Sequence, residues 1–386
     1  MNPLILSLSK DERALPLTVR PAHREREIAA DFSPLRRYRI IGAVNISELG
    51  EFGLIDRLAQ AFSALGGRPD SLLVGIGDDA AAWKASGVQL ITTDTLIEGT
   101  HFSLRYWGWR DLGWNALAVN VSDIGAMGGT PEQALLTLAL PPETPVADLD
   151  ELAAGLVEAG REYGTAIVGG DIVACDTLMV TVALTGRATV DAEGEPLLMT
   201  RDGARAGDVI AVTGYLGDSA GGLRLLLGEQ GADPEAAEHL KQANRRHRPP
   251  LALGRMAARL GVRAAIDVSD GLLQDLGHVC RASGLGAVVR ATGVPMSPAL
   301  VRSFPGQALA LACTGGEDYD LLVIAPGHAI QQVQRVSKGP VSIIGEMVED
   351  TERRVRLLDA SGQELSLPAA GWDHLRRGRP QGREAP

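Results

Sequence analysis

Aspartate residues follow apolar, strand-like stretches at four places in this chain of 386 residues. They are Asp78 and Asp79 after residues 74–76, Asp94 after residues 90–91, Asp171 after residues 167–168, and Asp267 and Asp270 after residues 265–266. Any one of them is equally well explained as a helix N-cap or a turn residue. Together they predict one acidic cluster, because the carboxyl ends of strands border the crevice in which α/β proteins bind ligands.

Such a cluster calls for a bound cation, since carboxylates held close together repel one another. Thr92, Thr93 and Ser269 would add hydroxyl oxygens beside the acids. Oxygen ligands without a set of His or Cys favour magnesium, manganese or calcium over zinc, and no EF-hand spacing occurs in the sequence. Because magnesium usually shares its ligand shell with substrate phosphates, a nucleotide is the expected second ligand.

A glycine-rich segment, residues 213–222, follows an expected strand and enters a helical run at residues 223–227. This is the placement that an anion-binding helix start requires. The segment matches neither a Walker A loop nor G-x-G-x-x-G, so a tight structural turn is an equal alternative to a phosphate site. Arg201 is a candidate phosphate ligand, with a surface ion pair as its alternative.

Three further residues are candidates for substrate contact. His101 follows a Gly-Thr pair beyond the Asp94 strand, where a structural histidine is the simpler interpretation. Glu317 lies between two apolar runs, residues 309–313 and 321–324, which we expect to be strands; it could face a cleft or cap a turn. Trp372 is a lone aromatic residue near the C-terminus, where stacking on a ligand ring and simple packing are both open.

Alternating helical and strand patterns position these residues and predict an α/β (α+β) fold. Residues 148–163 have one apolar helical face, and residues 178–186 alternate as a strand does. Turn formers and charges at residues 191–208 then precede a new strand at residues 209–213. We expect an N-terminal extension, a nucleotide- and metal-binding domain, a C-terminal domain and a tail, at residues 1–42, 43–198, 199–375 and 376–386.

The composition excludes several classes of protein. A formal net charge of −11 gives no general attraction to nucleic acid or to anionic membranes. No apolar run is long enough to cross a membrane, and the first eight residues are too short for a secretory signal. The three cysteines form no metal or redox motif, which suits a reducing compartment, so we expect a cytoplasmic protein.

Seven short motifs, taken in order, resemble those of thiamine-monophosphate kinase. They are residues 75–80 (GIGDDA), 93–96 (TDTL), 99–102 (GTHF), 118–123 (AVNVSD), 169–171 (GGD), 266–271 (IDVSDG) and 315–319 (GGEDY). The resemblance covers about residues 45–375. It implies the two-domain α/β fold shared with aminoimidazole ribonucleotide synthetase, and a homodimer formed through the sheet of the N-terminal domain.

The resemblance also implies an activity: transfer of the γ-phosphoryl group of ATP to thiamine monophosphate, which gives thiamine diphosphate. Magnesium ions would be held by Asp79, Thr92, Thr93, Asp94, Asp123, Asp171, Asp267 and Asp270. ATP would contact Gly170, Asp171, Arg201 and Ser269, and thiamine monophosphate would contact His101, Glu317 and Trp372. Position 92 is Thr where Ser is equally expected, and both residues offer a hydroxyl.

The sister enzymes of this family are the alternatives. Selenophosphate synthetase needs a reactive cysteine or selenocysteine near its N-terminus, but the first cysteine here is Cys175. The hydrogenase maturation dehydratase ends in a functional cysteine, whereas this chain ends in Pro386. An enzyme like aminoimidazole ribonucleotide synthetase stays open, as does a non-catalytic module that binds nucleotide or metal.

Overall fold

The computed structural model describes residues 45–65, 71–76, 80–229 and 234–367. The expected extension (residues 1–42), the expected tail (residues 376–386), Asp79 and Trp372 lie outside the described residues.

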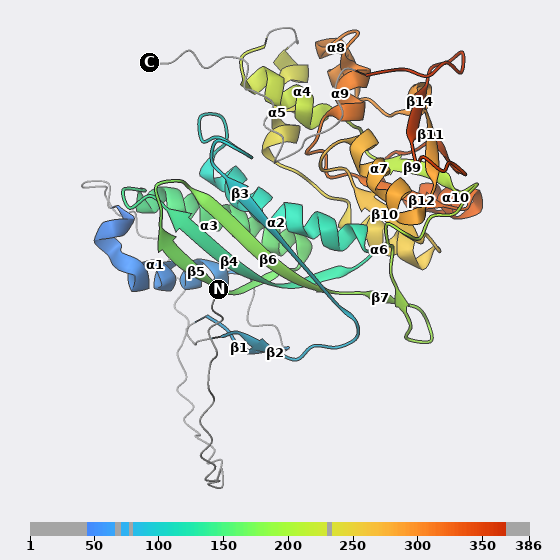
Figure 1. Ribbon diagram of the computed structural model, residues 1–386. Helices are drawn as coiled ribbons and strands as arrows, with labels where there is room; N and C mark the ends of the chain where they lie inside the picture. The colour runs from blue at the N-terminus through green and yellow to red at the C-terminus, as the bar shows by residue number, and fades with distance from the viewer. Residues whose placement is uncertain (1–44, 66–70, 77–79, 230–233, 368–386) are drawn as a thin grey trace, which may run out of the picture. The chain divides into compact units, whose positions relative to one another are not determined.

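The N-terminal half is built on a four-stranded sheet in the order β3-β6-β4-β5 (Figure 1). The strands are β3 (Gln89–Ile97), β4 (Thr130–Leu140), β5 (Ala166–Ala174) and β6 (Met179–Arg187). Neighbours are antiparallel except for the parallel pair β4 and β5. Two helices, α2 (Trp109–Ala126) and α3 (Val146–Tyr163), pack against each other, and α2 contacts β3, β4 and β6. A helix, α1 (Ile46–Ser63), contacts α3 and β5, and a small hairpin is formed by β1 (Leu72–Val74) and β2 (Ala82–Trp83).

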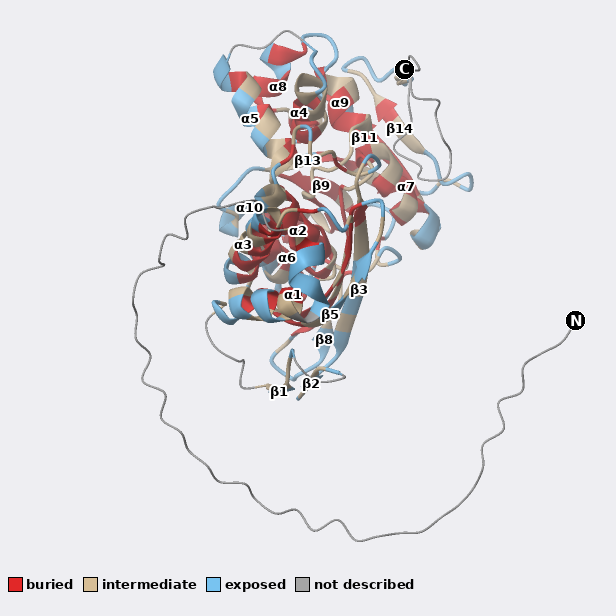
Figure 2. Ribbon diagram, turned by 90° about the vertical axis from the view of Figure 1, so that its left-hand side faces the viewer, coloured by how far each residue is buried: buried red, intermediate tan, exposed pale blue. Residues whose placement is uncertain are grey.

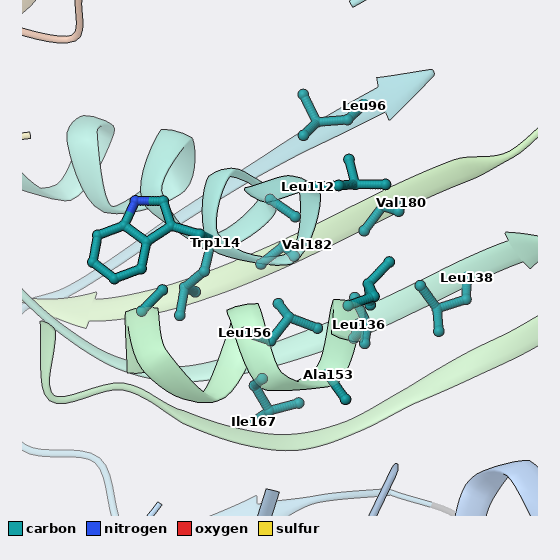
Figure 3. Packing of buried hydrophobic residues seen from close by; sticks show 14 of the residues in the cluster. Leu96, Leu112, Trp114, Leu136, Leu138, Ala153, Leu156, Ile167, Val180 and Val182 are labelled. Carbon is teal, nitrogen blue, oxygen red and sulfur yellow. The ribbon is translucent and has the colours of Figure 1, made fainter. Parts of the chain in front are cut away.

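Apolar side chains from both helices and from the sheet form the core of this half. Figure 3 shows Leu112 and Trp114 of α2, Leu156 of α3, and Leu136 and Val182 of the sheet directed into one layer. The alternation of the strands explains this layer, because every second residue of β6 is buried. The intervening residues lie on the opposite face of the sheet, where Ile91 of β3 is 78% exposed. Stretches of β3 are accordingly pale blue in Figure 2.

The C-terminal half contains a six-stranded sheet in the order β10-β12-β9-β13-β11-β14. The strands are β9 (Val209–Thr213), β10 (Ala264–Asp267), β11 (Gly286–Arg290), β12 (Leu321–Ala325), β13 (Val341–Val348) and β14 (Val355–Leu358). Apolar residues of α7 (Leu272–Ser283) and α9 (Ala308–Thr314) join one core with the sheet, and those of α6 (Leu251–Arg259) and α10 (Gly327–Val336) join another. A helical group completes this half: α4 (Asp218–Leu226), α5 (Pro234–Arg245) and α8 (Pro298–Ser303). The short elements β7 (Thr189–Val190), β8 (Pro196–Leu197) and a 3-10 turn at Ala291–Gly293 lie outside the two main sheets.

The end of α5 and the residues after it connect the C-terminal half to the start of α2 through hydrogen bonds. The Trp107 indole donates to the Asn244 side-chain oxygen at 3.0 Å, and the Trp114 indole donates to the carbonyl of His247 at 2.7 Å. Asn115 donates to the carbonyl of Arg245 at 2.9 Å and accepts from the amide of His247 at 3.0 Å. These buried bonds fix residues 244–247 beside the helix that carries Asp123.

The structure confirms the helix expected at residues 148–163 and the strands expected at 178–186 and 209–213. The strand expected at residues 309–313 is wrong, because these residues form α9. A short, continuous apolar run has no periodicity that separates a buried strand from a buried helix. Asp94 and Asp171 lie inside β3 and β5 rather than at strand ends, whereas Asp267 does end β10.

No helix in the described part of the chain is long and apolar enough to cross a membrane.

Candidate functional site

Thr92, Asp94 and Asp123 form the centre of an acidic cluster between β3 and α2. Thr92 and Asp94 are two residues apart on β3 and therefore share one face of the sheet. The Thr92 hydroxyl donates to the Asp123 carboxylate at 2.5 Å. Burial and the neighbouring Asp123 carboxylate raise the pKa of Asp94 to about 6. Burial also raises the pKa of Asp123, against the opposing effects of the Thr92 bond and the positive charge of Arg201.

Asp267 brings the C-terminal half into this cluster. It ends β10, its side chain is buried, and the Ser122 hydroxyl donates to its carboxylate at 2.6 Å. Burial and the negative charge of Asp123 raise the pKa of Asp267 to about 7. Ser122 and Asp123 are consecutive on α2, so one turn of this helix contacts both β3 and β10.

The donor set of this cluster fits a hard divalent cation. Asp94, Asp123 and Asp267 offer carboxylate oxygens, and Thr92 offers a hydroxyl. Burial raises the pKa of all three carboxyl groups, and the charge of Asp123 adds to the rise at Asp94 and Asp267. A bound cation would offset both effects, and oxygen ligands select magnesium, manganese or calcium.

Asp270 lies in the turn that connects β10 to α7. The Asp275 carboxylate accepts from the amides of Ser269, Asp270 and Gly271 at 3.0, 3.0 and 3.1 Å, which holds this turn in place. Oxygen atoms of Asp270 and Asp275 and a ring nitrogen of His278 all lie within 4.8 Å of one another. Sequence reasoning missed Asp275; its position in the first turn of a helix, just after the Asp270 motif, was the available signal.

Glu317 is held close to Ser269 by the loop between α9 and β12. Its amide donates to the Ser269 carbonyl at 2.8 Å, and its carboxylate accepts from Asn244 at 3.4 Å. Gly316 permits this approach, because a Cβ atom there would lie 2.5 Å from the Ser269 carbonyl oxygen. Burial raises the pKa of Glu317 to about 7.

Three other predicted residues have different surroundings. The Thr93 hydroxyl donates to the carbonyl of Val182 at 3.0 Å, on the face of β3 opposite Thr92 and Asp94. His101 Nδ1 accepts from the amide of Ile97 at 3.1 Å in the turn after β3. Arg201 is exposed, and its charge acts on Asp123.

Gly170 and Asp171 lie at the opposite edge of the sheet from Asp94. Asp94 pairs with Val182, Val182 with Leu136, and Leu136 with Gly170. Asp94 and Gly170 are therefore the two ends of one row of paired residues that crosses all four strands. At roughly 4.8 Å per strand, this row is about 14 Å long. Gly170 and the exposed Asp171 instead line a cavity of about 920 Å³, together with residues that flank the Asp78-Asp79 segment. The single acidic cluster expected from the sequence is therefore two groups within one chain.

The glycine-rich turn before α4 is filled by a side chain of the protein itself. The Asp318 carboxylate accepts from the amides of Gly217 and Ser219 at 2.7 and 3.3 Å. The Thr213 hydroxyl donates to Asp320 at 2.7 Å on the same side of the loop. Because Asp318 occupies the helix start where a phosphate would bind, the geometry favours the structural-turn interpretation of residues 213–222.

The comparisons with known proteins agree with this architecture. The sequence models for the N-terminal and C-terminal domains of AIR synthase related proteins match residues 77–188 and 205–357. Thiamine-monophosphate kinase of Escherichia coli K12 is 38% identical over 334 residues, which cover 84% of this chain and 98% of the relative. The Mycobacterium tuberculosis protein of that name is 35% identical over 310 residues, covering 78% of this chain and 88% of the relative. The chain belongs to the thiamine-monophosphate kinase family.

Solved structures of the thiamine-monophosphate kinase family have the same fold. The protein from Stenotrophomonas maltophilia K279a superposes with a TM-score of 0.70 at 33% identity, covering 82% of this chain and 98% of its own. AaThiL in complex with AMPPCP and TMP has a TM-score of 0.66 at 31% identity, covering 85% of this chain and 98% of its own. Family membership confirms the two-domain α/β fold expected from the sequence.

Proposed function

We propose that this chain transfers the γ-phosphoryl group of ATP to the phosphate of thiamine monophosphate, giving thiamine diphosphate and ADP. The observation that carries the proposal is that Asp94 and Asp123 of the N-terminal half lie close to Asp267 of the C-terminal half. The chain that brings them together matches thiamine-monophosphate kinases over most of its length. The two ligands in the AaThiL complex, AMPPCP and TMP, support the same pair of substrates.

The chemistry needs positioning more than proton transfer. A phosphate oxygen of thiamine monophosphate forms a bond to the γ-phosphorus, the bond from that phosphorus to the β,γ-bridging oxygen breaks, and ADP leaves with the electron pair. The attacking oxygen is already anionic at neutral pH, so no general base is required. The protein's task is to hold two anions together and to stabilise the transferring group.

Magnesium would supply the positive charge that this reaction needs, and the carboxylates would hold it. We propose Thr92, Thr93, Asp94, Asp123, Asp171, Asp267, Asp270 and Asp79 as ligands of several magnesium ions. Gly170, Asp171, Arg201 and Ser269 would contact ATP, and His101, Glu317 and Trp372 would contact the thiamine end. A buried carboxylate at Glu317 suits the cationic thiazolium ring, because charge pairing offsets the cost of burying either group.

A homodimer would complete the site. The open face of the N-terminal sheet presents Ile91 and Leu135, which are 78% and 44% exposed, to solvent. A second copy of the chain would cover this face. It would also offer its own Gly170 and Asp171, which one chain keeps at the sheet edge away from Asp94. The acidic charge and free cysteines favour the cytoplasm as the compartment.

Product formation tests the proposal. Purified protein with ATP, magnesium and thiamine monophosphate should form thiamine diphosphate and ADP in equal amounts, as measured by chromatography. A reaction without protein and a reaction without thiamine monophosphate are the controls. Nucleotide binding without thiamine diphosphate would instead indicate a non-catalytic module or a different acceptor.

A further inference from the structure

The loop that carries Glu317 also carries Tyr319, and both residues have a left-handed backbone. Their φ angles are 65° and 54°, and Arg353 is the only other described residue besides glycine with positive φ. A bulky residue adopts this conformation only when the surrounding structure holds it there, and such residues concentrate at functional sites.

The conformation sorts the side chains of this loop into two groups. Asp318 and Asp320 contact the turn before α4, where they accept hydrogen bonds from Gly217 and Thr213. Glu317 and Tyr319 alternate with them: the Glu317 carboxylate accepts from Asn244, whereas the Tyr319 amide donates to Val268, directly after Asp267, and the negative charges of Glu317 and Asp94 both act on the Tyr319 hydroxyl. The two residues with a left-handed backbone therefore have surroundings different from those of Asp318 and Asp320, and Tyr319 is the one beside the acidic cluster.

The Tyr319 ring packs against the buried His247 ring. Its centroid lies 4.7 Å from that of His247, which is 3% exposed and packs in turn against Trp107 at 6.0 Å. The Tyr319 amide donates to the carbonyl of Val268 at 2.9 Å, directly after Asp267. Ring and backbone are thus both held next to the end of β10.

The hydroxyl of Tyr319, in contrast, has no hydrogen-bond partner among the residues that the structure describes. The side chain is only partly buried, so this hydroxyl is open to a ligand. Burial and the charges of Glu317, Asp94, Asp267 and Asp123 raise the pKa of Tyr319 well above its usual range. A tyrosine hydroxyl is protonated at neutral pH, so it can act as a hydrogen-bond donor.

We propose that the Tyr319 hydroxyl donates a hydrogen bond to the phosphate of thiamine monophosphate. The proposal rests on the proposed function, in which Glu317 binds the thiamine end and Asp94, Asp123 and Asp267 hold metal. The acceptor phosphate must then lie between these two groups, and the charges of both groups act on the Tyr319 hydroxyl. In a site lined with carboxylates, a neutral donor adds attraction for an anion, so Tyr319 favours the phosphorylated substrate over thiamine itself.

Tyr319→Phe is the decisive variant because it removes the hydroxyl and keeps the ring against His247. Binding of thiamine monophosphate and of thiamine is measured by calorimetry, in the presence of magnesium and a non-hydrolysable ATP analogue. A lost hydrogen bond to a charged group should weaken binding of thiamine monophosphate roughly 10- to 100-fold, and binding of thiamine less than about 2-fold. The kcat/KM for thiamine monophosphate should fall by a similar factor, with the KM for ATP unchanged.

Tyr163→Phe is the matched control, since Tyr163 packs on Trp114 of the N-terminal core and should leave both affinities unchanged. Equal affinities in Tyr319→Phe and wild type would overturn the proposal. An equal loss for both ligands would also overturn it, because it would mean that the hydroxyl serves the thiamine portion common to both ligands and not the phosphate. Failure of the wild-type protein to form thiamine diphosphate would instead reject the proposed function, so the two failures are distinguishable.

Discussion

At the scale of single residues, the unusual feature is a set of carboxylates that are less acidic than normal. Burial raises the pKa of Asp94 to about 6 and those of Asp267 and Glu317 to about 7. In solution such groups titrate near pH 4. The difference has a consequence for stability and another for metal binding.

The stability of the metal-free protein should fall as pH rises. Between about pH 4 and pH 7 the unfolded chain has lost protons that folded Asp94 and Asp267 still hold, so the free energy of unfolding decreases with pH and then levels off. Magnesium binds the ionised carboxylates, so its stabilising effect should grow over the same range. Melting curves from pH 5 to pH 8, with and without magnesium, would measure both trends. A magnesium effect equally large at pH 5 and pH 8 would contradict the assignment of this cluster to metal binding.

Asp267→Asn should separate function from folding. The substitution keeps the volume and removes one buried charge, so the melting temperature without ligand should stay level or rise. Turnover should fall by roughly two orders of magnitude or more, because a ligand for the metal is lost. Asp359→Asn, in an exposed turn near the end of the described chain, is the control. Normal activity of Asp267→Asn at limiting magnesium would show that the carboxylate only serves the fold.

At the scale of elements, β4 and β5 approach each other so closely at Gly170 that no side chain fits. A Cβ atom there would lie 1.8 Å from the Leu136 carbonyl oxygen, so Gly170→Ala must push β5 away from β4. We expect a loss of about 1 to 3 kcal/mol in the free energy of unfolding and a raised KM for ATP. Gly339→Ala, where the added atom would meet nothing within 4 Å, is the control. An unchanged melting temperature in Gly170→Ala would contradict this account of the strand pair.

The same elements show how far sequence reasoning reaches. Helix 148–163 and strand 178–186 were predictable because their periodicity is local. The partners that position the site were not predictable, because they are far apart in the sequence. Ser122 and Asp267 are separated by 145 residues, and Asn244 and Trp107 by 137. Strand order was equally hidden, since only pairing through β6 and β4 reveals that Asp171 lies at the edge opposite Asp94. Tyr319 is two residues after the predicted Glu317 in the sequence, but its positive φ is visible only in the structure.

At the scale of the whole molecule, the face of the N-terminal sheet that carries Ile91 and Leu135 is open to solvent in a single chain. If a second copy covers it, Ile91→Glu places a charge in that interface and should convert dimers to monomers and lower turnover. Leu227→Glu changes an equally prominent residue, 67% exposed at the end of α4, and should leave the oligomeric state unchanged. Light scattering after size exclusion would measure both. A monomeric wild-type protein at micromolar concentration, active as such, would contradict the shared site.

The central claim is direct phosphoryl transfer between two bound anions, and isotope transfer tests it most directly. The protein is incubated with magnesium, thiamine monophosphate and ATP labelled at the γ-phosphate, and the products are separated. We predict that the label appears in thiamine diphosphate, in equal amount to the ADP formed, and that little appears as inorganic phosphate. Label released as inorganic phosphate, with no labelled thiamine diphosphate, would contradict the account.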